Sequence, residues 1–152
     1  MSPSDRLRDY LDTIDAAAVH QERAQRLLAL YLRFPGVEPT GFFVSEYPED
    51  DGTRVYESLW LFSENLAMEA QFPAPGEEHF DFVPLSNAVR HVIVEAKEYN
   101  LAEASIASRM RVEAWFSENR MGELRASGRN CEALRAVLND YLLPNLATPS
   151  SD

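Results

Sequence analysis

The sequence is poor in the residues that most often carry covalent or phosphate chemistry. Cys131 is the one cysteine among 152 residues, so no disulfide can form within the chain and the packed core must hold the fold together. Six glycines are scattered along the chain, too few for a glycine-rich phosphate loop, and no HExxH, GxSxG or CxxC pattern occurs. The sequence therefore contains no catalytic motif.

Long hydrophobic runs are also lacking. The longest apolar run, around Leu27 to Leu32, is far shorter than the roughly 20 residues that cross a bilayer. The N-terminus has no basic segment followed by an apolar one, as a secretory signal would. We therefore predict a cytoplasmic protein, and its 45% apolar and 26% charged residues are typical of a globular domain.

Basic residues are scarce in the middle of the chain. Residues 34 to 104 contain three basic and fourteen acidic residues, whereas the flanking segments are balanced, so the net charge of −11 comes from this middle segment. Such a surface repels phosphates, and we expect neither nucleic acid nor membrane as a partner. The acidic excess is compatible with a basic protein partner, but we favour a solvated face that keeps the protein soluble.

The N-terminal segment from Ser4 to Phe34 has helical apolar spacing, and Pro35-Gly36 ends it. One unbroken helix would be about 45 Å long, more than a small sheet covers. The segment is therefore either two helices, restarting near Asp15, or one helix that packs on another subunit. In the second case the apolar side chains would form a homodimer interface, for which we name Leu7, Leu11, Ile14 and Leu28.

Alternating apolar and polar residues predict antiparallel strands at 41–47, 54–63, 66–72 and 80–85. The segment 54–63 is apolar on both faces, with Val55, Leu59 and Leu61 on one and Tyr56, Trp60 and Phe62 on the other. Such a strand is usually covered on both sides, and the N-terminal helix is the expected cover. The segment 89–99 is ambiguous, but its β-branched residues favour a strand over a helix.

The last part of the chain predicts a hairpin followed by a helix. Met110, Val112, Ala114 and Phe116 alternate with Arg109, Arg111 and Glu113, and a second alternating segment follows a turn at 118–120. From Asn130 the spacing becomes helical. The resulting apolar stripe, which we expect to lie on the sheet, is formed by Cys131, Leu134, Leu138, Tyr141 and Leu142.

Three segments resemble bacterial and GRAM-type members of the pleckstrin-homology-like superfamily: SLWLFSENLAMEA (58–70), FVPLSNAVRHVIVE (82–95) and the hairpin with its helix (109–140). The resemblance implies an α+β fold, with a seven-stranded antiparallel barrel over 39–145 closed by the C-terminal helix. A helical segment (1–38) would precede this barrel, and a disordered tail (146–152) would follow it.

Phosphoinositide-binding members of the superfamily place several basic residues around the first hairpin loop. Here that loop, residues 46–52, is acidic, with Arg54 as the only nearby cation. We therefore expect no phosphoinositide binding by the usual route.

The candidate site residues are few. Glu77, Glu78, His79 and Asp81 could in principle hold a metal ion, but we interpret them as an exposed acidic loop and predict no metal and no cofactor. Trp115 lies on the polar register of its strand, which makes it the best interface candidate. The predicted binding residues are Tyr47, Arg54, His79, Trp115 and Arg120.

Three functional hypotheses follow. The leading one is a non-enzymatic module that binds a protein partner and forms a homodimer through its N-terminal helix. The second is an acidic, dimeric secretion-chaperone-like protein, which would require a helix over 86–99. The third is a small-ligand binder or enzyme, which would require Arg54, His79 and Arg120 to converge.

Overall fold

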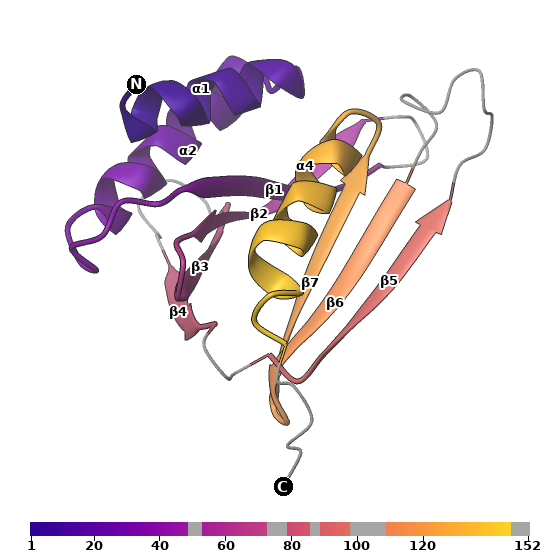
Figure 1. The fold of residues 1–152 in the computed structure, drawn as a ribbon. Coiled ribbons are helices and arrows are strands. Elements are labelled where there is room, and N and C mark those ends of the chain that lie inside the picture. Colours follow the sequence, from indigo (N-terminus) through magenta and orange to yellow (C-terminus); the bar gives the residue numbers. More distant parts are fainter. Residues whose placement is uncertain (49–52, 73–78, 86–88, 98–108, 147–152) are drawn as a thin grey trace, which may run out of the picture.

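The chain forms two helices, two antiparallel sheets and a closing C-terminal helix (Figure 1). The computed structural model describes residues 1–48, 53–72, 79–85, 89–97 and 109–146. The helices α1 (Pro3–Thr13) and α2 (Ala18–Tyr31) come first. One sheet contains β1 (Gly41–Pro48), β2 (Arg54–Phe62), β3 (Leu66–Gln71) and β4 (Phe80–Pro84); the other contains β5 (His91–Lys97), β6 (Arg109–Ser117) and β7 (Arg120–Ser127). The chain then enters α4 (Asn130–Val137) and the π-helical turn η2 (Leu138–Leu142).

The β1–β4 sheet separates two hydrophobic cores. On one face α1 and α2 pack against it, and the core there includes Leu7, Leu11, Leu27, Tyr31, Val44, Leu59, Leu61 and Met68. On the other face lie the second sheet and α4, with a core that includes Phe43, Trp60, Phe62, Val112, Leu124 and Leu134. The prediction that β2 is covered on both faces, with the N-terminal helices as one cover, is confirmed.

The predicted orientation of one β2 side chain is wrong. Tyr56 was expected to share a face with Trp60, but the register shifts between Ser45 and Glu46, so that Ser58 pairs with Ser45 and Tyr56 with Glu46. The extra residue on β2, Glu57, reverses the alternation at this point. Tyr56 therefore packs on the helix side, where its ring centroid lies 4.5 Å from that of His20.

The N-terminal segment is two helices, which agrees with the first of the two alternatives. The break contains Asp15 with φ 55°, a left-handed conformation that an α-helix cannot include, and α2 begins at Ala18. Leu7, Leu11, Ile14 and Leu28 are at most 1% exposed, because they pack against the chain's own sheet. Their assignment to a homodimer interface is therefore corrected: these side chains are already used within one copy.

The C-terminal stripe packs as predicted, with Cys131, Leu134 and Leu142 buried and Leu138 and Tyr141 partly buried against the same core. Residues 91–97 form a strand, as favoured, which removes the helix that the secretion-chaperone arrangement needs there. The predicted tail begins one residue too early, since Leu146 packs on the core and bridges to Val89. Residues 86–88, 98–99 and 147–152 lie outside the described part of the chain.

The predicted barrel is not closed over the described residues. The strands form two sheets, β1–β4 and β5–β7, which approach each other where β1 lies beside β7, and α4 packs on both of these strands. The coarser prediction of seven antiparallel strands with a C-terminal helix is confirmed. None of the described helices has the length and hydropathy to cross a membrane.

Side chains from other elements form hydrogen bonds with the backbone of β1 on the edge that faces away from β2. The hydroxyl of Tyr10 accepts from the backbone N–H of Val44 (2.8 Å) and donates to Oδ1 of Asn130 (2.6 Å), and Nδ2 of Asn130 donates to the Val44 carbonyl (2.8 Å). Beside them, Oγ of Ser45 accepts from the backbone N–H of Arg125 at 3.0 Å. These bonds connect α1, β1, β7 and α4, and we call them the β1 seam.

We predict that Tyr10→Phe lowers the free energy of unfolding by about 1–3 kcal/mol, because it leaves the Val44 N–H and the Asn130 amide oxygen without the hydroxyl in a buried site. The control is Tyr141→Phe, which removes a hydroxyl whose bond to Thr40 is exposed, at an expected cost of about 0.5 kcal/mol or less. Urea denaturation followed by tryptophan fluorescence measures both. Equal losses for the two variants would contradict the role of the β1 seam.

Candidate functional site

The outer face of the β5–β6–β7 sheet carries four rows of side chains, set by the pairing of the strands. From one end to the other the rows are His91, Trp115 and Met121; then Ile93, Glu113 and Glu123; then Glu95, Arg111 and Arg125; then Lys97, Arg109 and Ser127. The face therefore changes from aromatic at one end, through a band of acidic and basic residues, to basic at the other.

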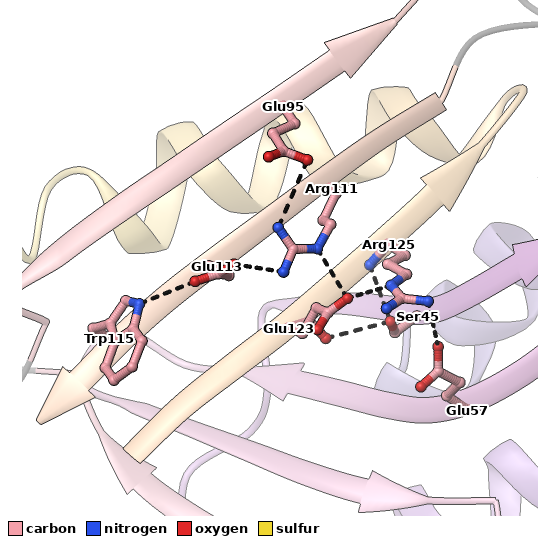
Figure 2. Close-up of polar contacts among 8 residues, drawn as sticks. All are labelled: Ser45, Glu57, Glu95, Arg111, Glu113, Trp115, Glu123 and Arg125. Carbon is pink, nitrogen blue, oxygen red and sulfur yellow. Dashed lines mark hydrogen bonds and ion pairs between the residues drawn. The ribbon is translucent and has the colours of Figure 1, made fainter. Parts of the chain in front are cut away.

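The two central rows contain like charges directly opposite each other, Glu113 with Glu123 and Arg111 with Arg125. Such pairs are unfavourable alone, but ionic hydrogen bonds along each strand and diagonally between the strands compensate for them (Figure 2). Nε of Arg111 donates to Glu123 at 3.0 Å and its Nη2 to Glu113 at 2.5 Å, while Nε of Arg125 also donates to Glu123. Weaker ion pairs extend this charge network to Glu95 (3.7 Å) and Glu57 (3.9 Å).

Two members of the charge network, Arg111 and Glu123, are stabilised in their ionised forms. Hydrogen bonds to Glu123 and Glu113 raise the pKa of Arg111. Burial alone would raise the pKa of Glu123, but hydrogen bonds from Arg111 and Arg125 outweigh it, and the pKa is lowered. Fixed ions of this kind can orient and recognise a ligand, but they do not exchange protons with one near pH 7.

Trp115 dominates the aromatic end. Its ring stacks on that of His91, with centroids 5.4 Å apart and planes at 20°, and its Nε1 donates to Glu113 at 3.2 Å. The side chain is half-buried, so one part of the indole is held in place while another part meets solvent. A fixed, partly exposed indole is typical of a contact residue in protein interfaces.

The basic end contains a cavity of about 350 Å³ where β5, β6 and β7 meet the end of β1. The guanidinium of Arg125 lies over the ring of Tyr47, 5.8 Å from its centroid. Four basic side chains contribute to the lining, in a protein with a net charge of −11. The lining residues are Glu46, Tyr47, Glu95, Lys97, Arg109, Met110, Arg111, Arg125 and Ala126.

Two of the five predicted binding residues belong to this face. Tyr47 and Trp115 lie at its opposite ends and are connected through Arg125, Glu123, Arg111 and Glu113. Sequence reasoning missed the remaining members of the charge network. The alternation of residues 109–116 predicts that Arg111 and Glu113 lie on the same side of the strand as Trp115. It does not show which residues of the neighbouring strands lie opposite them, because that depends on the strand register.

The other three predicted residues lie elsewhere. Nη1 of Arg54 donates to the Ile14 carbonyl at 3.1 Å, and His79 is exposed just before β4. Arg120 donates to Glu69 at 2.9 Å, and Glu69 pairs with Trp60, six residues along β2 from Arg54. At about 3.3 Å per residue this separates the two sites by roughly 20 Å, so Arg54 and Arg120 cannot share a small substrate.

Over the residues that the structure describes, no group of three or more His, Cys, Asp or Glu side chains could hold a metal ion. Glu77 and Glu78 of the proposed acidic cluster lie outside them.

No family model, curated protein or solved structure matches the chain.

Glu46, beside the cavity, is a buried carboxylate with incomplete bonding. Its residue is 1% exposed, and Oε1 accepts from the hydroxyl of Ser127 at 2.9 Å. No hydrogen-bond donor from the described residues reaches Oε2, and Nη1 of Arg54 lies 3.8 Å from it. Burial raises the pKa of Glu46, and the nearby Arg54 opposes this only in part.

The raised pKa predicts the sign of a pH effect. The folded state favours the protonated carboxyl of Glu46. The contribution of this carboxyl to the free energy of unfolding is therefore fully present below its ordinary pKa of 4.5, and it is lost as pH rises through the higher pKa of the folded state. We predict that Glu46→Gln is more stable than the parent protein at pH 7, by on the order of 1 kcal/mol. The gain should shrink as pH falls from the folded pKa towards 4.5, and it should be lost below 4.5, where the carboxyl is protonated in both states.

Urea denaturation at several pH values tests this prediction. The control is Glu57→Gln, whose side chain is 44% exposed and should show no such gain. A Glu46→Gln variant that is less stable than the parent protein at pH 7 would mean that the charged form is favoured by the fold.

Proposed function

We propose that this protein is a non-enzymatic interaction module that binds a segment of a protein partner on the outer face of the β5–β6–β7 sheet. The observation that supports this most directly is the fixed, partly exposed Trp115 on an otherwise ionic sheet face. Trp115 is held on one side by His91 and through its indole N–H by Glu113, so binding would cost little side-chain entropy.

The two ends of the face suit different groups of one bound segment. An apolar side chain fits beside Trp115 and Ile93, which is 45% exposed. An acidic group fits the cavity lined by Lys97, Arg109, Arg111 and Arg125, where the basic side chains would attract it and the Tyr47 ring would pack on it. The ionic band between them has a glutamate row and then an arginine row, and it would favour a partner that places a basic group over the first row and an acidic group over the second.

The chemistry of the face supports recognition rather than catalysis. Its arginines and glutamates are paired with one another as ions, and its aromatic residues are Trp115, His91 and Tyr47. None of these contacts joins a nucleophile to a general base. The enzyme hypothesis requires Arg54 and Arg120 to converge on one substrate, and their separation does not support it.

The test is capture from a native cell extract on the immobilised protein, with quantitative mass spectrometry of what is retained. Trp115→Ala and Lys97→Glu should each reduce the partner by at least about tenfold, because loss of a central tryptophan commonly costs about 2 kcal/mol or more. Phe34→Ala is the control, since Phe34 is an aromatic residue that is 61% exposed and lies on the other sheet's side, against Phe80.

A protein that is lost from both face variants but retained by Phe34→Ala would support the proposed site. Retention of the same proteins by all variants would contradict it. If Phe34→Ala alone fails to retain a protein, the binding site for that protein lies at the aromatic residues around β4. Thermal unfolding of each variant separates loss of binding from loss of fold.

A further inference from the structure

The two sheets end in edge strands of opposite character. The edge strand β4 has five residues and ends in Pro84, and its Phe80 and Phe82 pack against Phe34. Short edge strands that end in proline and are covered by side chains resist pairing with another chain. On this side the fold protects its edge.

The other edge, β5, has none of these protections. It has seven residues, contains no proline, and pairs in regular register with β6 on its inner side. No strand of the described chain pairs with its outer side, where it lies at the margin of the molecule (Figure 1). Ile93 and Val94, at its centre, are 45% and 43% exposed and point to opposite faces of the sheet. An edge of this kind favours strand addition.

We propose that a second copy of this chain occupies this edge, with the two β5 strands antiparallel across a two-fold axis centred on Ile93. This pairing would join the two three-stranded sheets into one of six strands. It does not rest on the proposed function: it uses the backbone edge of β5 and covers Ile93, whereas Trp115 and the cavity stay on the outer face.

The sequence of β5 selects this register. In a two-fold antiparallel pair, facing residues lie on the same side of the sheet, which leaves three registers that pair at least five residues of β5. A pair centred on Glu95 sets two carboxylates against each other. A pair centred on Val94 sets Ile93 against Glu95, and His91 against Lys97.

The register centred on Ile93 is self-complementary on both faces. Ile93 faces Ile93 of the second copy on the outer face, and Val92 faces Val94 on the inner face, so the exposed apolar surface of both strands is covered. At each end His91 faces Glu95 of the second copy, which matches an imidazole donor with a carboxylate. Apolar pairs and opposite charges stabilise antiparallel strands, and this register supplies both.

Sedimentation equilibrium of the full chain over a wide concentration range is the first measurement, and we expect a monomer–dimer equilibrium. Ile93→Lys should weaken the dimer by about tenfold or more, because it sets two ammonium groups against each other at the axis. Val19→Lys is the matched control: Val19 is 58% exposed on α2, and the charge there should leave the dimer unchanged. Mixing Ile93→Lys with Ile93→Glu should restore association as a heterodimer.

Cysteine cross-linking tests the register itself. With Ile93→Cys, the two introduced thiols face each other across the axis, within the Cα separation of a disulfide, so mild oxidation should link the dimer. With Val94→Cys the introduced thiols are diagonal neighbours, roughly 7–8 Å apart, and should link poorly. The native Cys131 is buried and should not react.

A chain that is monomeric at all concentrations would overturn the proposal. A dimer that Ile93→Lys leaves intact would overturn it as well and would place the contact on another surface. A dimer that links through Val94→Cys rather than Ile93→Cys would contradict the register. Binding of a partner is measured with other variants, Trp115→Ala and Lys97→Glu, so the two proposals can fail separately.

Discussion

The fold depends on how the outer edge of β1 is satisfied. This strand ends the four-stranded sheet, and its Val44 N–H and carbonyl face away from β2, inside the molecule, where water cannot bond them. Tyr10 of α1 provides the acceptor for the Val44 N–H, and Asn130 in the first turn of α4 provides the donor for the Val44 carbonyl. A hydrogen bond also joins the side chains of Tyr10 and Asn130 to each other, so α1 and α4 are both attached to β1 at Val44.

The same edge decides where the second sheet lies. Because Ser45 bonds to the Arg125 backbone and Glu46 to the Ser127 hydroxyl, β7 is held beside β1 through side chains rather than a continuous ladder. Opposite Ser45 and Glu46, the extra residue Glu57 forms a bulge in β2, which increases the local twist of the strand pair. Just beyond this point Tyr47 lies against the Arg125 guanidinium, and the cavity is found where the end of β1 meets the outer face. The site is a consequence of the way in which the sheets join.

The sequence predicted the parts that depend on local periodicity. The strands, the β6–β7 hairpin and the helical stripe of Cys131 and Leu134 follow from apolar spacing, and the structure agrees with them. It could not show that Tyr10, Val44 and Asn130 meet, because they are far apart in the chain and each is unremarkable where it stands. The reversal of Tyr56 has the same cause, since one extra residue opposite β1 is visible only once the strands are paired. Likewise, the apolar stripe on α1 and α2 predicts that this face of the helices is buried. It does not show whether the surface that packs against it belongs to the same chain or to a second copy.

The distribution of charge shows why a property of the whole chain is a poor guide to one surface. The net charge of −11 argues against anionic partners on average. The four rows of the outer face nevertheless contain Lys97, Arg109, Arg111 and Arg125 against Glu95, Glu113 and Glu123, a slight basic excess of four to three. Because water and salt screen charges beyond about 10 Å, a ligand on this face responds mainly to these side chains and much less to the acidic residues elsewhere. An acidic surface of this kind repels the phosphates of nucleic acid, whereas the local basic excess makes the outer face the place where we propose that an acidic group of a specific partner binds.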